Sequence, residues 1–76
     1  MKELVEVIAK ALVSNPDGVV VTESVNDDGE TVLELTVDPA DMGKVIGKQG
    51  RIAKAIRSLV KAAASREDKH VSLEIQ

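Results

Sequence analysis

A short glycine-bounded run, Val45–Ile52, holds the residues of this chain that are best suited to binding a charged ligand. Gly47 and Gly50 enclose two polar residues, and glycine lacks the Cβ that keeps other backbones away from a ligand. A helical pattern follows, and the unpaired N–H groups and positive dipole at the start of a helix favour an anion. Because Lys48 and Arg51 add positive charge at the same place, the run predicts a site for phosphate groups.

The spacing of the glycines separates this run from other phosphate-binding loops. A Walker A loop needs four residues between its glycines and a Ser or Thr after its lysine, whereas three residues separate Gly43 from Gly47, and Gln49 follows Lys48. The dinucleotide pattern G-x-G-x-x-G would need a glycine where Val45 stands. ATP and NAD sites are therefore disfavoured. Two interpretations stay open: a clamp on a phosphate backbone, or only a tight corner between two helices.

Charge is distributed unevenly along the 76 residues, although the net charge is only −3. Residues 1–40 carry two basic and nine acidic side chains, whereas residues 41–70 carry eight basic and three acidic ones. Arg51, Lys54 and Lys61 share one face of a predicted helix, with Arg57 beside it. The local field steers a polyanion more than the net charge does, so the second half of the chain favours a nucleic-acid partner. An ordinary solvated helix face is the alternative interpretation.

Helical spacing, alternation and turn residues predict six elements in the order α-β-β-α-α-β. Asn15 and Pro16 end the first helix, and a turn at Asn26–Gly29 joins two strands into an antiparallel hairpin. Asp38 as N-cap and Pro39 at the first helical position begin the second helix. A right-handed crossover should place the last strand parallel to the strand before the helices. The predicted helices cover residues 2–14, 40–46 and 51–65, and the predicted strands cover residues 19–25, 31–37 and 71–75.

Each of the two long helices carries more than one apolar stripe, and one stripe is enough to contact the core. We expect the remaining stripes to be surface that is free for a second copy of the chain; the alternative is that the monomer buries them all. The residues expected to face inward are Leu4, Ile8, Ala11 and Leu12 on the first helix and Ile52, Ile56, Leu59 and Ala63 on the last. The residues expected to remain free are Val5, Ala9, Val13 and Ala62–Ala64.

Composition and residue pattern disfavour several functional classes. The chain has no cysteine for disulfides or thiolate metal sites, no signal peptide, and no apolar run near the roughly 18 residues of a membrane span. His70 is the only histidine and lies on the solvent-facing phase of a strand, while the hairpin turn explains Asp27 and Asp28 without a metal. Asp41 is interpreted as a helix cap or as an orienting partner of a lysine. We expect one small, soluble, cytoplasmic domain over residues 1–76, with no catalysis, metal or cofactor.

The segment from Val45 to Arg57 is similar to the I-G-x-x-G-x-x-I core of K-homology (KH) domains, and the order of elements resembles the type II topology of that family. The resemblance covers essentially the whole chain and extends to small single-domain bacterial KH proteins. It implies an α+β fold in which a three-stranded mixed sheet packs against helices on one face. It also implies RNA binding in the cytoplasm, a homodimer or a heterodimer with a larger KH protein, and a role in post-transcriptional control linked to cell-envelope growth and cell shape.

Carried onto this sequence, the resemblance implies that the Gly47–Gly50 loop clamps the backbone of single-stranded RNA. The chain has no aromatic residue, so recognition must use aliphatic contacts and hydrogen bonds instead of base stacking. Val45, Ile46 and Ile52 either line the groove or fill the core. A KH-shaped protein-interaction or dimerisation module without nucleic-acid binding is the alternative function. The residues implied in RNA binding are Gly47, Lys48, Gln49, Gly50, Arg51, Lys54, Lys44, Arg57, Val45 and Ile46.

Overall fold

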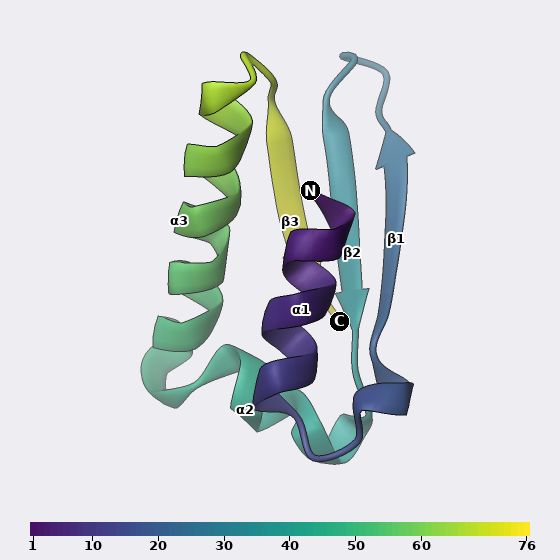
Figure 1. Ribbon diagram of the computed structural model, residues 1–76, viewed down its shortest axis with the longest axis vertical. Coiled ribbons are helices and arrows are strands. Elements are labelled where there is room, and N and C mark those ends of the chain that lie inside the picture. The colour runs from purple at the N-terminus through teal and green to yellow at the C-terminus, as the bar shows by residue number, and fades with distance from the viewer.

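The computed structural model describes residues 1–76, and its elements follow the predicted order (Figure 1). The helices are α1 (Lys2–Leu12), α2 (Met42–Ile46) and α3 (Arg51–Arg66), and the strands are β1 (Val20–Val25), β2 (Thr31–Thr36) and β3 (Val71–Ile75). These bounds lie within two residues of the predicted ones. Three single turns of 3-10 helix, which apolar spacing does not predict, are η1 (Pro16–Gly18), η2 (Pro39–Asp41) and η3 (Lys48–Gly50).

The three strands form one mixed sheet in the order β1-β2-β3, as predicted. β1 pairs antiparallel with β2, and β2 pairs parallel with β3. Val21 faces Leu35 across the first pair, and Leu33 faces Leu73 across the second. The helices cover one face of this sheet, with α1 in front of it and α3 running beside β3 in Figure 1. The α+β fold with a single helical layer is therefore confirmed.

The turn residues act as their chemistry predicts. The Asp38 carboxylate accepts a hydrogen bond of 3.0 Å from the backbone N–H of Ala40, which makes it the predicted N-cap, and Pro39 holds the first helical position. In the hairpin, the Asn26 side-chain oxygen accepts backbone hydrogen bonds from Asp28 and Glu30. These bonds fix the hairpin turn.

The core is built from aliphatic side chains alone, and of the four residues of α1 that were expected to face inward, Ile8 alone packs against it. Val5 and Ala9 are completely buried, and Val13 packs partly against the core. Leu4 and Leu12 are each 37% exposed. Helical period alone does not decide between two apolar stripes on one helix. The β-branched Val5 and the small Ala9 let α1 approach the sheet closely, whereas the longer leucines fit at the edges of the contact.

The predicted faces of α3 need a similar correction. Leu59 is 54% exposed and Ala63 is only half-buried, although both were expected inside. Ile56 is buried and Ile52 packs against the core, as predicted, and the buried stripe is completed by Ala53, Val60 and Ala64. Ile56, Val60 and Ala64 follow one another at intervals of four residues, so they lie along one line that faces β3 and β2. Among the alanines expected to be free, Ala64 is therefore buried and Ala62 is exposed.

None of the three helices combines the length and the apolar composition that a membrane crossing requires.

Candidate nucleic-acid interface

The Gly47–Gly50 loop reverses the chain direction between α2 and α3 through an unusual run of left-handed backbone angles. The φ angle is +76° at Gly47, +59° at Gln49 and +73° at Gly50. The Gly47 N–H bonds the carbonyl of Gly43 at 2.9 Å to end α2, and the Gly50 N–H bonds the Gly47 carbonyl at 3.1 Å. The loop lies at the lower end of the molecule in Figure 1, away from the hairpin turn.

The two glycines of the loop are needed for different reasons. A Cβ on Gly47 would lie 2.5 Å from Cγ1 of Ile52, which is packed against the core, so this site lacks both the space and the backbone angles for a side chain. A Cβ on Gly50 would meet no atom within 4 Å, so only the left-handed angle restricts that site. The open space at Gly50 leaves the loop backbone accessible from outside.

Exposed polar groups gather on this loop. Lys48 forms no hydrogen bond or ion pair within the protein, so its ammonium group is available to an anion. The Arg51 guanidinium donates a 3.2 Å hydrogen bond to the side-chain oxygen of Gln49. No side chain caps the start of α3, and its first turn contains no acidic residue. The positive end of this 16-residue helix therefore faces solvent beside Lys48.

Cationic and apolar side chains lie on different sides of α3. Arg57 donates a 3.2 Å hydrogen bond from Nε to the carbonyl of Leu73, which places it on the β3 side of the helix. Lys54 and Lys61 lie one turn before and one turn after Arg57 and are exposed on that same side. The other side faces α1 and lines a shallow, mainly apolar cavity formed by Leu4, Leu59, Ala62, Ala63 and Arg66.

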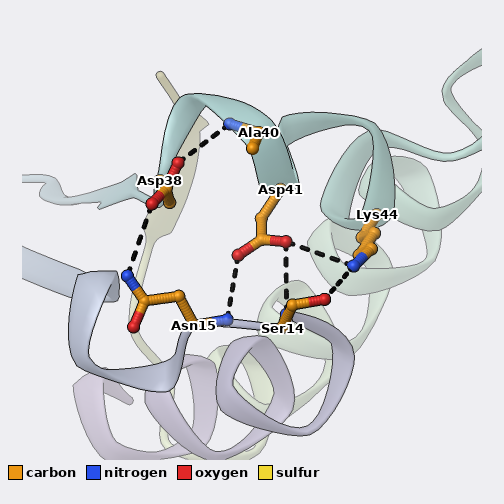
Figure 2. A network of polar contacts seen from close by, with 6 residues as sticks. All are labelled: Ser14, Asn15, Asp38, Ala40, Asp41 and Lys44. Atoms are coloured by element: carbon orange, nitrogen blue, oxygen red, sulfur yellow. Dashed lines mark hydrogen bonds and ion pairs between the residues drawn. The ribbon is translucent and has the colours of Figure 1, made fainter.

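A buried carboxylate ties α2 to the segment that follows α1 (Figure 2). Asp41 is 3% exposed, and its oxygens accept hydrogen bonds from the backbone N–H groups of Ser14 and Asn15 at 3.2 and 3.1 Å. The Lys44 ammonium lies 3.3 Å from the same carboxylate and also donates to the Ser14 hydroxyl. Beside them, the Asn15 amide donates to Asp38 at 3.3 Å. Asp41 therefore orients a lysine, one of its two predicted roles, and joins three segments.

Comparison with known proteins places this geometry in a family. The family description "KhpA/KhpB, KH domain" matches residues 2–75. The chain belongs to the KhpA/KhpB KH-domain family. The RNA-binding protein KhpA of Clostridium perfringens is 63% identical over 75 residues, which cover 99% of each chain. The RNA-binding protein KhpA of Aquifex aeolicus is 52% identical over 75 residues, which cover 99% of this chain and 94% of that one.

A solved structure agrees with this family at the level of the fold. The chain superimposes on part of the crystal structure of Aquifex aeolicus Era bound to GDP and aluminium fluoride, with a TM-score of 0.58 and 23% identity. The match covers 97% of this chain but only 28% of the Era chain. At that identity, the likeness concerns the arrangement of helices and strands alone.

In this KhpA/KhpB-family chain, the residues implied in RNA binding separate into three groups. The loop residues, Arg51, Lys54 and Arg57 lie at the loop and along the β3 side of α3. Lys44 is the only one of the implied basic residues that forms an ion pair, and its partner is buried. Val45 is completely buried and fills the core, while Ile46 is half-buried against it. The contact of Arg57 with the outer edge of β3 could not be predicted from the sequence, because every residue has a backbone carbonyl and no residue type marks this one.

The Asp41 contacts have a consequence for stability against acid. Burial alone would raise the pKa of the Asp41 carboxyl, but the N–H groups of Ser14 and Asn15 and the Lys44 ammonium together lower the pKa below its ordinary value of 3.8. A lowered folded-state pKa means that the carboxylate stabilises the fold above about pH 4. This contribution is lost as the pH falls through the folded-state pKa.

We expect Asp41→Asn to lower the urea midpoint of unfolding at neutral pH and to flatten the loss of stability below pH 4. The amide keeps the size of the side chain but removes the charge that holds Lys44 and two N–H groups. Urea unfolding at a series of pH values measures both effects. Asp28→Asn is the matched control, because Asp28 lies in the exposed hairpin turn and its side chain has no partner. Equal pH profiles for wild type and Asp41→Asn would contradict the argument.

Proposed function

We propose that this chain is a non-catalytic RNA-binding adaptor that clamps the backbone of single-stranded RNA with the Gly47–Gly50 loop. The observation that carries the proposal is the loop itself, which presents accessible backbone and the unpaired Lys48 at the positive end of α3. Phosphate groups suit such a site. The relatives named RNA-binding protein KhpA support RNA as the polymer that supplies them. A cytoplasmic location and a part in post-transcriptional control belong to the same proposal.

The charges of the molecule indicate the path of the strand beyond the loop. Arg57, Lys54 and Lys61 continue the positive surface along the β3 side of α3. The open face of the sheet is acidic, since Glu34 and Glu74 stand next to each other in register there. RNA would therefore follow α3 and the outer edge of β3. Because β3 is an edge strand, the outward backbone groups that Arg57 does not occupy could bond base edges, in place of part of the recognition that aromatic stacking provides in other RNA-binding proteins.

A salt titration tests the electrostatic part of this proposal. If two to four phosphates are neutralised, the logarithm of the binding constant should fall against the logarithm of salt concentration with a slope of roughly −1.5 to −3. Lys54→Ala and Arg51→Ala should each make the slope shallower by about 0.7. Lys2→Ala, an exposed lysine at the start of α1, which is the end of that helix away from the loop in Figure 1, should leave the slope unchanged. Fluorescence anisotropy with a short labelled RNA measures the slopes, and a slope near zero would refute the proposal.

A specific observation also favours self-association, as a homodimer. The Leu59 side chain, 54% exposed, and the Leu4 side chain, 37% exposed, meet at the apolar cavity between α1 and α3, where the small Ala62 and Ala63 permit close approach. We propose this surface for the second copy, in place of the stripe Val5–Val13, which the core consumes. A larger KH protein on the same surface is the other occupant that the family suggests. Pairing would make a second contact with a long RNA effectively intramolecular.

We expect the wild-type protein to sediment as a dimer at micromolar concentration and Leu59→Glu to sediment as a monomer. In a dimer, the carboxylate introduced at position 59 would be buried without an oppositely charged partner. Binding to long RNA should then weaken far more than binding to a four-nucleotide RNA, because only long RNA reaches both copies. Val7→Glu is the matched control, since Val7 is 67% exposed and lies outside the cavity. A wild-type protein that stays monomeric would contradict the homodimer.

A further inference from the structure

A second, polar cavity lies at the end of the molecule opposite the Gly47–Gly50 loop. It has a volume of about 470 Å³ and is formed where the end of α3 turns into β3, with Glu30 of the hairpin on its rim. In Figure 1 this region is at the top, where the green helix joins the yellow strand. Its polar side chains that have no hydrogen bond or ion pair within the protein are Glu30, Lys61, Ser65, Asp68, His70 and Ser72.

The cavity is continuous with the proposed RNA path. Lys61 lines it and also lies on the β3 side of α3, one turn beyond Arg57. At a rise of 1.5 Å per residue, Lys61 is about 15 Å along the helix from Arg51. A strand clamped at the loop over about four nucleotides and following α3 therefore reaches the cavity only with the nucleotides beyond the clamp.

The lining of the cavity offers hydrogen-bond acceptors for a base as well as a cation for its phosphate. The carboxylates of Glu30 and Asp68 lie near the carbonyl end of α3, which carries the negative end of the helix dipole. The lining also contains Lys61, His70 and Lys69, and the ammonium group of Lys69 is paired with Glu67. Carboxylates accept hydrogen bonds from the exocyclic amino group of cytosine, whereas uracil presents an acceptor at the same position. Lys61, which lines the cavity and also lies on the β3 side of α3, would hold the phosphate of the same nucleotide.

We propose that this cavity is a subsite for one further nucleotide, which prefers cytidine to uridine. The proposal rests on the proposed RNA binding by the Gly47–Gly50 loop and extends it. The loop supplies affinity through the phosphate backbone, and the cavity supplies selectivity at a distance from the loop.

The test uses five labelled RNAs: a four-nucleotide RNA, and the same sequence extended by four cytidines or by four uridines, with each extension made at the 5′ and at the 3′ end in separate probes. We expect the four-nucleotide RNA to bind. We also expect the cytidine extension at one end to bind at least about fivefold more tightly than the uridine extension. In the double variant Glu30→Gln, Asp68→Asn, this ratio should fall to about one, while binding of the four-nucleotide RNA changes no more than in the control.

The matched control is Asp17→Asn, Glu23→Gln, which removes the same charge from exposed positions outside the cavity and should keep the cytidine preference. Thermal unfolding of each variant checks that the fold is retained, and the ratio of two affinities is insensitive to a general change in charge. Equal affinity for both extensions, or a preference that persists in the double variant, would overturn the subsite while leaving the loop clamp standing. Failure of every probe to bind would overturn both proposals.

Discussion

Replacing Lys48 and Gln49 together by aspartate is expected to lower the affinity for single-stranded RNA by at least about a hundredfold. The change removes the one unpaired ammonium group of the loop and puts two carboxylates where phosphates should lie. Like charges about 4 Å apart repel by roughly 1 kcal/mol in water and about 4 kcal/mol near a protein surface, which corresponds to this loss. The fold should persist, because both side chains are exposed and the glycines remain. Anisotropy titration with a labelled RNA gives the affinity.

The controls for this result are a charge change elsewhere and a check of the fold. Lys2→Asp makes the same change in charge as Lys48→Asp, but it lies at the start of α1, where an acidic residue is tolerated. It should leave RNA affinity within about twofold, given the screening of distant exposed charges by salt. Circular dichroism and urea unfolding show whether each variant is folded. Undiminished RNA binding by the folded double variant would place the clamp elsewhere on the molecule.

Gly47→Ala is expected to lower the free energy of unfolding by about 3–5 kcal/mol, against about 1 kcal/mol for Gly50→Ala. At Gly47, the φ and ψ angles of +76° and +175° belong to a region that glycine alone occupies at low energy, and the new methyl group would overlap Ile52. At Gly50, the angles of +73° and +14° are left-handed helical, and the space for a methyl group is open. Urea unfolding compares the two.

A third variant separates the two causes of the loss at Gly47. Gly47→Ala combined with Ile52→Ala removes the overlap but keeps the strained backbone angles, so part of the lost stability should return relative to the sum of the single changes. The stability that returns measures the cost of the overlap with Ile52, and the loss that remains at Gly47 measures the cost of the strained backbone angles. Equal losses for Gly47→Ala and Gly50→Ala would show that the contact with Ile52 has no energetic weight.

The elements of the fold were predictable because local chemistry decides them. Asp at the N-cap followed by Pro is a frequent start of a helix, as at Asp38 and Pro39, and the Asn26–Gly29 turn is held by the side chain of Asn26. The faces of α1 and α3 were not predictable in the same way. Each helix offers two apolar stripes with the same period, and only the approach to the sheet buries Val5 and Ala9 and leaves Leu4 and Leu12 exposed. That selection is a property of the packed molecule.

The candidate site shows the same division between local and distant causes. The identities of Gly47 and Gly50 predict a sharp turn, but nothing in the sequence indicates that Gln49 also adopts a left-handed angle. The Asp41–Lys44 pair is three residues apart on adjacent turns and was partly foreseen as an orienting contact. The backbone N–H groups of Ser14 and Asn15, which satisfy the same carboxylate, lie 27 and 26 residues away. Contacts over such distances appear only in the folded chain.

The two sides of α3 carry different kinds of side chain, so substitutions on one side can accumulate in evolution independently of substitutions on the other. A change at Lys54 or Arg57 alters the side of α3 that we propose for RNA, and a change at Leu59 or Ala62 alters the side toward α1, with the shared buried stripe between them. Each surface can therefore drift or adapt without damaging the other, as long as Ile56, Val60 and Ala64 keep the helix seated. On the two proposals above, related chains could exchange protein partners and keep their RNA preference, or change their RNA preference and keep their partners.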